Sequence, residues 1–267
     1  MNHQTGGLQA RDLHVSYGSR KVIAGLNVDI TPSKITAIIG ANGCGKSTLL
    51  KALANLIPHD AGRVTLDGTD VTELRRRELA RRLSMLPQSP IAPDGIGVAE
   101  LVARGRHPHQ TWLQQWSDDD MQAVAQVLAL TGISDLAERR LENLSGGQRQ
   151  RAWIAMVLAQ ETPLILLDEP TTYLDLSHSI EVLELVRSLA NELGRTVVMV
   201  LHDLNLAARY CDDLILLKDG QIVAQGTPAD VLTSQLLAVV FGLDAIVIDD
   251  PVTGGPLVVP NEQKFVA

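Results

Sequence analysis

The sequence predicts an α/β fold with a largely parallel sheet, and three features of the chain support this. A compact apolar run with β-branched residues, 35–39, is followed by a glycine-rich turn and then by a helix-like stretch, 46–56. Further short apolar runs are typical of strands separated by helical segments, and they lie at 63–66, 84–86, 164–167, 197–201 and 214–217. Between residues 91 and 161 apolar residues recur at helical spacing, which predicts a helical subdomain inserted into the sheet domain.

The two ends of the chain have a different pattern. Residues 8–30 alternate short β-like runs with turn residues, which predicts an antiparallel hairpin or small sheet. Residues 245–260 contain two β-rich pieces around Gly254 and Gly255, which predicts a hairpin. We therefore expect a core of residues 1–90 and 162–267, a helical subdomain at 91–161, and a hairpin-like tail at 245–267 within the core.

Composition excludes several classes of protein. The chain has 267 residues, 45% of them apolar and 20% charged, which is ordinary for a folded domain. Its longest apolar stretches fall far short of the ~20 residues that span a bilayer, and residues 1–11 contain no apolar signal segment, so we expect a cytosolic chain. A net charge of −8 and 3% aromatic residues disfavour a nucleic-acid partner. Two cysteines, Cys44 and Cys211 in a helical stretch, exclude a disulfide framework or a paired-cysteine metal site.

One basic run interrupts this acidic chain. Arginines are interleaved with Leu74, Leu79 and Leu83 in a segment that is expected to form an amphipathic helix, and they stand at positions 75, 76, 77, 81 and 82. A solvated helix face is one interpretation, and a contact with anionic lipid or with a partner protein is the other.

Residues 40–48 fit the phosphate-loop pattern, with Gly40, Gly45, Lys46 and Ser47 at the required spacing after a buried strand. Glycines allow backbone N–H groups to curl around a polyphosphate, and the following helix presents its positive end to it. Lys46 adds a mobile cation, and Ser47 is placed to bind Mg²⁺. The residues expected to contact the nucleotide in this loop are Gly40, Asn42, Gly43, Cys44, Gly45, Lys46, Ser47 and Thr48.

An acidic pair follows another buried run. Asp168 and Glu169 come directly after the apolar residues 164–167. Asp168 is expected to be the carboxylate on the Mg²⁺ side, and Glu169, which points elsewhere, can orient or deprotonate an attacking water. The alternative is a polar strand end that stops at Pro170.

A second glycine pair precedes a helical run. Ser145, Gly146, Gly147 and Gln148 come directly before the apolar helical residues 152–159, so they predict another helix N-terminus suited to anions. One chain thus has two phosphate-binding surfaces and a single carboxylate pair, and two copies facing each other would satisfy both.

At this point the chain resembles a known family. Residues 144–148 resemble the signature sequence of ABC ATPases, and they precede Asp168 by the expected interval. Tyr17 resembles the aromatic residue that stacks on adenine, and Gln88 resembles the loop glutamine that joins the active site to the helical subdomain. Taken singly, Tyr17 is more often a packing aromatic and Gln88 a surface turn residue. Together the elements occur in the family's order.

Two further residues complete the resemblance. Asp175 resembles the family's dimer-contact aspartate, and His202 resembles the histidine that contacts the γ-phosphate. The resemblance implies a P-loop NTPase (RecA-like) core with an antiparallel β subdomain and an inserted α-helical subdomain. It also implies ATP and Mg²⁺ as cofactors.

The resemblance assigns a role to each site residue. ATP would lie on residues 40–48 and Tyr17, and Ser145, Gly146 and Gly147 of a second copy would cover it. Gln148 and Asp175 also belong to the set expected to bind the nucleotide. Mg²⁺ would be held through Ser47, Gln88 and Asp168. The catalytic set would be Glu169, His202, Gln88 and Lys46.

Finer features are similar to importer ATPases for iron-siderophore, haem and vitamin B12 complexes. These features lie at 101–109, 153–160 and 248–260, and the last is most similar to the ferric enterobactin subgroup. They imply an ATPase subunit that energises uptake of a ferric siderophore, with haem or vitamin B12 as alternatives. Ala41 stands where the family often has proline, and Tyr173 where many members have a small residue.

The resemblance also implies partners. We expect a homodimer bound to two integral-membrane permease subunits, with a substrate-binding protein as an indirect partner and no nucleic acid. The chain would be peripheral, at the cytoplasmic face of the inner membrane, with a permease contact near Gln88 and residues 104–109.

Two other functions fit the sequence less well. A soluble ABC ATPase of DNA repair would need a long coiled-coil insertion, and one acting on ribosomes usually carries two ATPase units; this chain shows neither. A regulatory module without turnover conflicts with the intact pair Asp168 and Glu169.

Overall fold

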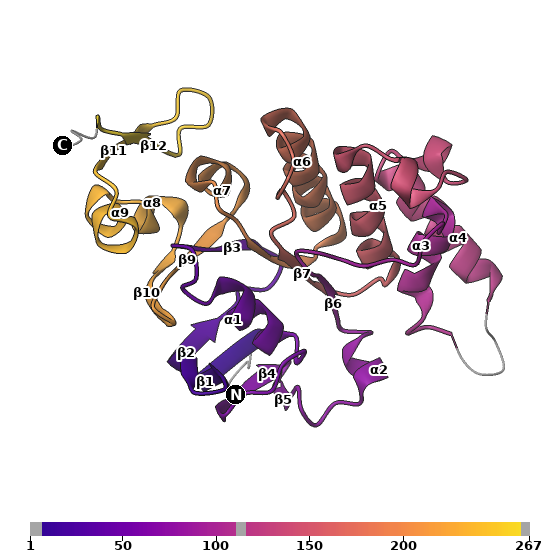
Figure 1. Ribbon diagram of the computed structural model, residues 1–267, viewed down its shortest axis with the longest axis horizontal. Coiled ribbons are helices and arrows are strands. Elements are labelled where there is room, and N and C mark those ends of the chain that lie inside the picture. The colour runs from indigo at the N-terminus through magenta and orange to yellow at the C-terminus, as the bar shows by residue number, and fades with distance from the viewer. Residues whose placement is uncertain (1–6, 111–115, 263–267) are drawn as a thin grey trace. The chain divides into compact units, whose positions relative to one another are not determined.

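Figure 1 shows the computed structural model, which describes residues 7–110 and 116–262. The chain divides into two compact units. The first unit combines Met1–Glu73 with Val197–Ala267, and the second is Leu74–Thr196. The domain boundaries expected from the sequence, at 91 and 161, stay a prediction.

The first unit contains an antiparallel sheet in the order β2-β1-β4-β5. Buried apolar residues alternate with more exposed polar residues along most of β1. One face of the strand therefore covers the core, and the polar residues lie on the other face. The predicted antiparallel pairing within 8–30 is confirmed, and the run at 63–66 belongs to this sheet and not to the parallel one. The strands are β1 (Leu8–Tyr17), β2 (Arg20–Asp29), β4 (Ala61–Leu66) and β5 (Thr69–Asp70).

The same unit holds a group of parallel strands. All six residues of β3 (Ile35–Gly40) are buried, and β3 pairs in parallel with β8 (Thr196–Val200) on one side and β9 (Asp213–Lys218) on the other. β10 (Gln221–Gly226) pairs antiparallel with β9. The helices of this unit are α1 (Lys46–Leu53), α7 (Leu204–Tyr210), α8 (Pro228–Val231) and α9 (Ser234–Phe241).

The predicted C-terminal hairpin is confirmed. β11 (Ala245–Asp249) pairs antiparallel with β12 (Pro256–Pro260). The side chain of Asn205, on α7, donates to the Val258 carbonyl oxygen at 3.2 Å and accepts from the Val258 N–H at 2.8 Å. These two bonds attach the hairpin to α7.

The second unit is mainly helical. α5 (Gly146–Ala159) contacts α3 (Val98–Ala103), α4 (Asp118–Leu130) and α6 (Leu176–Leu193), as Figure 1 shows. Three short 3₁₀ turns connect these helices, at Arg104–Arg106, Ser134–Leu136 and Leu141–Asn143. The helical periodicity expected between 91 and 161 is therefore found. Strands β6 (Leu83–Leu86) and β7 (Leu164–Asp168) pair in parallel in this unit.

One local prediction was only partly right, and another was wrong. The basic run forms only the four-residue helix α2 (Arg76–Leu79), because Leu83 already starts β6 and pairs with Leu164. Strand pairing overrides helix propensity there. Cys211 does not lie in a helix: it follows α7 with extended backbone angles, because the chain turns into β9 two residues later.

We find no helix within residues 7–110 and 116–262 with the length and apolar character to cross a membrane.

Candidate functional site

The phosphate loop lies in the first unit, between β3 and α1. Gly40 has a φ of 153°, and a Cβ atom at this residue would lie 2.2 Å from the carbonyl oxygen of Leu217 on β9. That neighbour is backbone and cannot rotate away, so only glycine fits at the point where β3 ends. The sheet thus fixes where the loop begins, and the loop residues Gly43 and Gly45 also have left-handed φ values.

Lys46 is folded back over this loop. Its side chain is buried, and its Nζ donates to the carbonyl oxygens of Gly40 at 2.8 Å and Ala41 at 3.0 Å. The ammonium group is therefore held beside the loop by groups only five and six residues away. Burial raises the pKa of the neighbouring Cys44 thiol, although Lys46 acts in the opposite direction, so this thiol stays protonated at neutral pH.

Two predicted nucleotide contacts belong to the same unit. Tyr17, at the end of β1, is 52% exposed, as a stacking residue must be. His202 is exposed after the end of β8, directly before Asp203, whose carboxylate caps α7. Ser47, in the first turn of α1, follows Lys46.

Strands β6 and β7 position a carboxylate pocket in the second unit. Leu86 pairs with Leu167, so the residues that follow these parallel strands emerge at the same edge. Gln88 Nε2 consequently donates to Glu169 Oε2 at 2.6 Å. The amide oxygen of Gln88 takes no part in this bond. Asp168, at the end of β7, is 1% exposed.

Thr172 makes a second hydrogen bond to the same carboxylate. Its hydroxyl group donates to Glu169 Oε2 at 2.8 Å. Glu169 itself has a φ of 54°, a conformation that non-glycine residues rarely adopt and that recurs at functional sites. A pocket of about 280 Å³ opens here, lined by Gln88, Ser89, Pro90, Gly146, Arg149, Gln150, Trp153, Glu169, Thr172, Tyr173 and Leu174. Glu169 is thus held in a fixed orientation in a pocket that can admit small molecules.

The helix predicted after the second glycine pair is present and begins at Gly146. Ser145 caps α5: its hydroxyl accepts from the Gln148 N–H, and the Gln148 side chain accepts from the Ser145 N–H. A Cβ atom on Gly147 would lie 2.4 Å from the ring of His178 on α6. His178 in turn donates its backbone N–H to Asp175 at 2.9 Å, and its ring Nδ1 lies 2.8 Å from the same oxygen. Gly147 and Asp175 are therefore joined through one histidine.

Comparison with known proteins identifies the family. The family model described as "ABC transporter" matches residues 23–172, more than half of the chain. The chain belongs to the ABC transporter family. Since its motifs are those of the family's ATP-binding subunits, it is an ATPase of the transporter type.

Curated ABC transporter proteins align with almost the whole chain. The petrobactin import ATP-binding protein FpuD of Bacillus anthracis is 50% identical, over 95% of this chain and 93% of its own length. The ferric enterobactin transport ATP-binding protein FepC of Escherichia coli is 50% identical, over 97% and 96%. The iron(3+)-hydroxamate import ATP-binding protein FhuC of Bacillus subtilis is 45% identical, over 97% and 98%.

Solved ABC transporter structures have the same fold. A chain of an ABC transporter in an inward-facing conformation has a TM-score of 0.84 and 30% identity, over 97% of this chain and 98% of that one. The dimeric structure of MJ0796, a bacterial ABC transporter cassette, has a TM-score of 0.73 and 27% identity, over 83% and 98%. The predicted ABC ATPase fold is confirmed.

Within this ABC transporter ATPase, sequence reasoning missed one residue and misjudged another. It missed Thr172, whose only local signal is a hydroxyl three residues after an acid. It placed Arg106 on a permease-facing surface, but Arg106 is 5% exposed. Its guanidinium donates to Asp120 at 2.8 Å, to Glu161 at 2.6 Å and to the Ala159 carbonyl at 2.8 Å. Burial lowers the pKa of Arg106, but these bonds outweigh burial and raise it.

Proposed function

We propose that this chain binds and hydrolyses Mg²⁺-ATP to drive import of a ferric siderophore. The observation that carries the proposal is the Glu169 carboxylate, which accepts hydrogen bonds from both Gln88 and Thr172 directly after the buried Asp168. A carboxylate fixed in this way can orient a water molecule and accept its proton without reorganising.

The donor groups assigned to Mg²⁺ fit this ion. Ser47 offers a hydroxyl group, Gln88 an amide oxygen and Asp168 a carboxylate, and Mg²⁺ prefers hard oxygen ligands. Bound Mg²⁺ would offset the charge that develops on the phosphate oxygens. The same Gln88 amide can contact both Glu169 and Mg²⁺, because its nitrogen donates to Glu169 and its oxygen is a separate atom that can act as a metal ligand.

The remaining residues bind the nucleotide or take part in its hydrolysis. Residues 40–48 hold the triphosphate through backbone N–H groups, and Lys46 exchanges its carbonyl partners for phosphate oxygens. Tyr17 stacks on adenine, and His202 contacts the γ-phosphate. Glu169 takes the proton of the attacking water as the water oxygen bonds to the γ-phosphorus. The bond between the γ-phosphorus and the bridging oxygen breaks, and ADP leaves.

The complete site needs a second copy. Ser145, Gly146, Gly147 and Gln148 form a helix N-terminus that suits phosphate, and Asp175 is joined to it through His178. We propose that these residues of one copy cover the nucleotide of the other. Hydrolysis would then remove the bridging γ-phosphate and release the pair.

The cargo and the partners follow from the relatives. FpuD, FepC and FhuC are named for import or transport of petrobactin, ferric enterobactin and iron(3+)-hydroxamate. We propose a ferric siderophore as the cargo of this system, with two permease subunits, an indirect substrate-binding protein and a peripheral place at the cytoplasmic face of the membrane. Cobalamin is second, because the cobalamin import protein BtuD of Halobacterium salinarum is 40% identical over 96% of this chain but only 64% of its own length.

The test is an uptake experiment. We expect deletion of the gene in its own host to abolish uptake of a labelled ferric siderophore and to leave uptake of haem and vitamin B12 unchanged. The wild-type gene should restore uptake, and a Glu169→Gln gene expressed to the same level should not. Loss of vitamin B12 uptake alone would contradict the proposed cargo, and full rescue by Glu169→Gln would contradict the proposed role of hydrolysis.

A further inference from the structure

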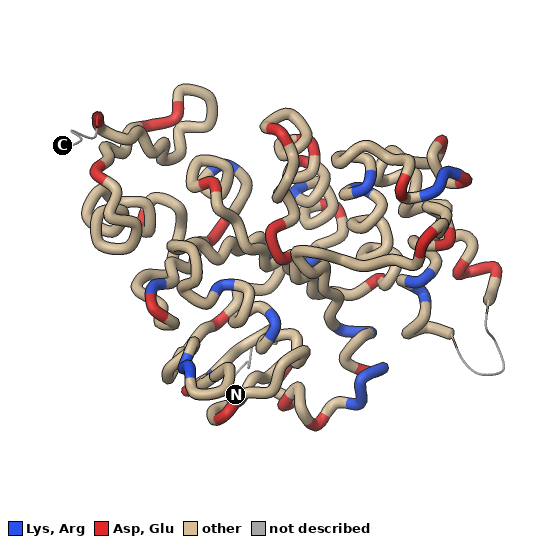
Figure 2. Tube along the Cα trace, viewed as in Figure 1, with Lys and Arg blue, Asp and Glu red and all other residues tan. Residues whose placement is uncertain are grey.

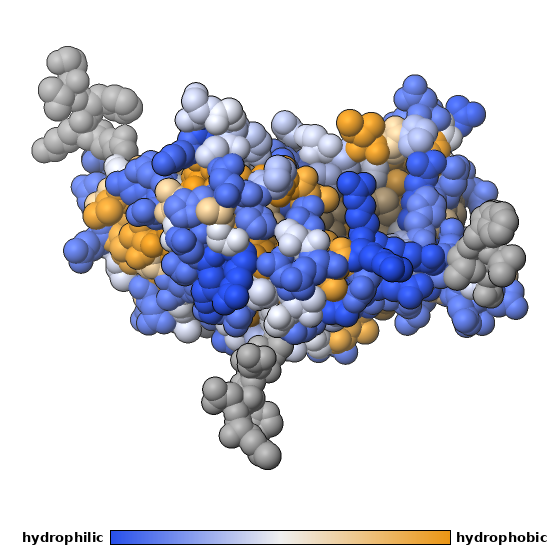
Figure 3. Space-filling model, turned by 90° about the horizontal axis from the view of Figure 1, so that it is seen from below, coloured by the Kyte–Doolittle hydropathy of each residue, from blue (hydrophilic) through white to orange (hydrophobic). Residues whose placement is uncertain are grey.

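The segment around α2 concentrates positive charge in an acidic chain. Between residues 75 and 82 it contains five arginines and one glutamate, whereas the whole chain has a net charge of −8. Figure 2 shows these basic residues gathered along α2, and Figure 3 shows a continuous strongly hydrophilic area where the surface is viewed from below. The family function described above uses none of these side chains.

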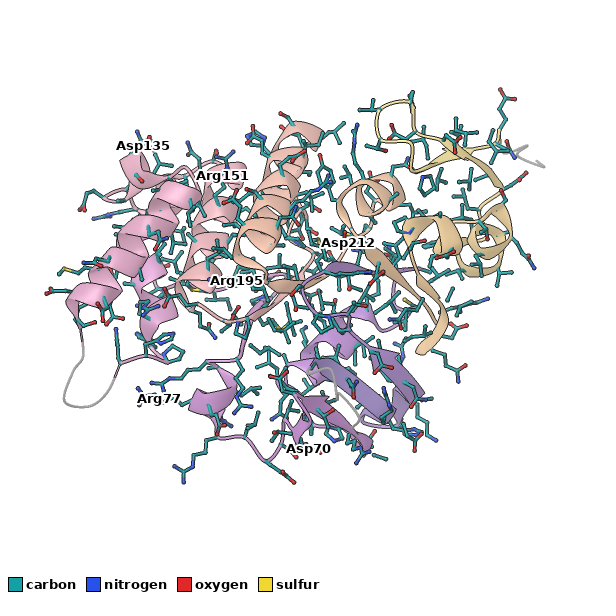
Figure 4. The ribbon with its side chains drawn as sticks, turned by 180° about the vertical axis from the view of Figure 1, so that it is seen from behind. Asp70, Arg77, Asp135, Arg151, Arg195 and Asp212 are labelled. Carbon is teal, nitrogen blue, oxygen red and sulfur yellow. The ribbon has the colours of Figure 1, made fainter. Side chains whose placement is uncertain are left out.

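Two of the arginines converge on one oxygen atom. Arg77 Nε and Arg81 Nε each donate to the carbonyl oxygen of Pro108 at 2.9 Å. Figure 4 shows Arg77 extending from α2 toward the segment that ends at residue 110. Two guanidinium groups of like charge are thus held close together through their Nε atoms, which leaves their Nη groups directed elsewhere. Such an arrangement costs energy unless an anion lies nearby.

The backbone under these side chains is anchored. Gln160 Nε2 donates to the carbonyl oxygens of Ala80 at 2.6 Å and Leu83 at 3.1 Å, and a ring nitrogen of His109 lies 2.8 Å from the Gln160 carbonyl. These bonds attach both sides of the arginine pair to the end of α5. The pair is therefore positioned before any anion binds.

One of the five arginines has an acidic partner. Arg82 is paired with Glu78 at 2.6 Å. The other four are exposed and have no ion pair in the part of the chain that the structure describes, and residues 1–6, 111–115 and 263–267 contain no aspartate or glutamate. We name these four residues the α2 arginine patch; they are Arg75, Arg76, Arg77 and Arg81.

We propose that the α2 arginine patch binds the phosphate groups of anionic phospholipids at the membrane surface. Arginine forks match phosphate oxygens in charge and geometry, and a cluster of four or more basic residues is the usual signature of anionic-lipid binding. The patch offers several separate charges over a short segment, which suits an array of headgroups better than one carboxylate of a partner loop. A chain of net charge −8 is repelled by an anionic bilayer, so the patch also determines which face approaches it.

Sedimentation with vesicles tests this proposal on the purified full-length chain. One set of vesicles contains phosphatidylglycerol mixed with phosphatidylcholine, and the other contains phosphatidylcholine alone. The test variant is Arg77→Ala with Arg81→Ala. The matched control is Arg139→Ala with Arg187→Ala, which removes the same charge from two exposed positions of the same unit. A third variant, Arg77→Lys with Arg81→Lys, keeps the charge and loses the fork, and circular dichroism confirms that each variant is folded.

We expect the wild type and the control pair to bind the anionic vesicles and not the neutral ones, and added salt to weaken binding. Each basic residue contributes roughly fivefold to partitioning onto such a surface, so the alanine pair should bind about 30-fold more weakly. Vesicle binding by the lysine pair should be intermediate between that of the wild type and that of the alanine pair.

Three results would overturn the proposal. Equal binding to neutral vesicles would exclude recognition of anionic headgroups, because phosphatidylcholine carries a phosphate group but no net charge. Displacement by inorganic phosphate, beyond that by chloride of equal ionic strength, would indicate a site for small phosphate compounds. A loss of permease co-purification in the alanine pair, with vesicle binding unchanged, would assign the patch to an acidic protein partner.

Discussion

The phosphate loop and the carboxylate pocket reach their geometry by different routes. In the loop, Lys46 bonds to carbonyl groups only five and six residues before it, and the residues that matter are consecutive. In the pocket, Gln88 and Glu169 are 81 residues apart and meet because β6 and β7 pair in register. The loop is therefore encoded by local backbone conformation, whereas the pocket is encoded by strand pairing. A change in one should leave the other intact.

The largest expected effect is on the pocket. Glu169→Gln keeps the shape of the side chain but removes the base, so turnover should fall by roughly 10²–10⁴-fold. ATP binding should be retained, because the loop is untouched. Single-turnover phosphate release measures the first quantity, and titration with a fluorescent ATP analogue measures the second. Normal phosphate release by this variant would remove Glu169 from the mechanism.

A buried ion pair outside both regions gives the next effect. Asp120→Asn leaves the buried Arg106 short of a partner, and breaking a buried pair costs about 3 kcal/mol of stability. Burial raises the pKa of Asp120, but hydrogen bonds from Arg106 and Ser117 outweigh burial and hold the pKa below the ordinary 3.8. The stabilisation is therefore present above pH 3.8 and is lost as pH falls through the lower folded value.

Urea unfolding of both proteins across pH tests this prediction. The stability difference should be constant from neutral pH to about pH 5 and should narrow progressively as the pH falls further. Nucleotide affinity of the folded variant is the control and should not change. A difference that already narrows near neutral pH would point to a group other than Asp120.

Lys46→Ala changes the phosphate loop and leaves the carboxylate pocket unchanged. Loss of a charge-assisted bond to phosphate costs about 2 kcal/mol, so nucleotide affinity should fall roughly 30-fold. Lys51→Ala, on the same helix, is the matched control. Equal affinities for both variants would exclude Lys46 from phosphate binding.

The smallest effect concerns Thr172. Thr172→Val removes one hydrogen bond to Glu169 and keeps the side-chain shape, so kcat should fall about fivefold, or roughly 1 kcal/mol. The KM for ATP should not change, because Thr172 positions the base and does not touch the loop. Thr172→Ser should restore kcat. If KM rises and serine does not rescue, Thr172 has only a packing role.

The same contrast explains how much the sequence could predict. Spacing alone predicted the loop from Gly40 to Thr48, because the local backbone conformation sets which residue types fit at these positions. Gln88 was assigned to the site only through family resemblance, and its hydrogen bond to Glu169 was not predicted, since register between distant strands leaves no local pattern. Nothing in the segment around Thr172 distinguishes its hydroxyl from that of a turn residue.

The burial of Arg106 was also not predicted from the sequence. Arg106 reads as a loop cation, and its partners Asp120 and Glu161 are 14 and 55 residues away. No periodicity links these three positions, so their burial follows only from the packing of the helices. The length of the α2 helix was overestimated for a similar reason, because the chain pairs as a strand from Leu83 onward.

The central claim is that two copies close on Mg²⁺-ATP and that Glu169 then ends the closed state. Light scattering on the Glu169→Gln variant tests it most directly. With Mg²⁺-ATP we expect a particle of twice the mass of the chain, and with Mg²⁺-ADP a single chain. A variant that binds Mg²⁺-ATP but keeps the mass of one chain would show that two copies do not close on the nucleotide.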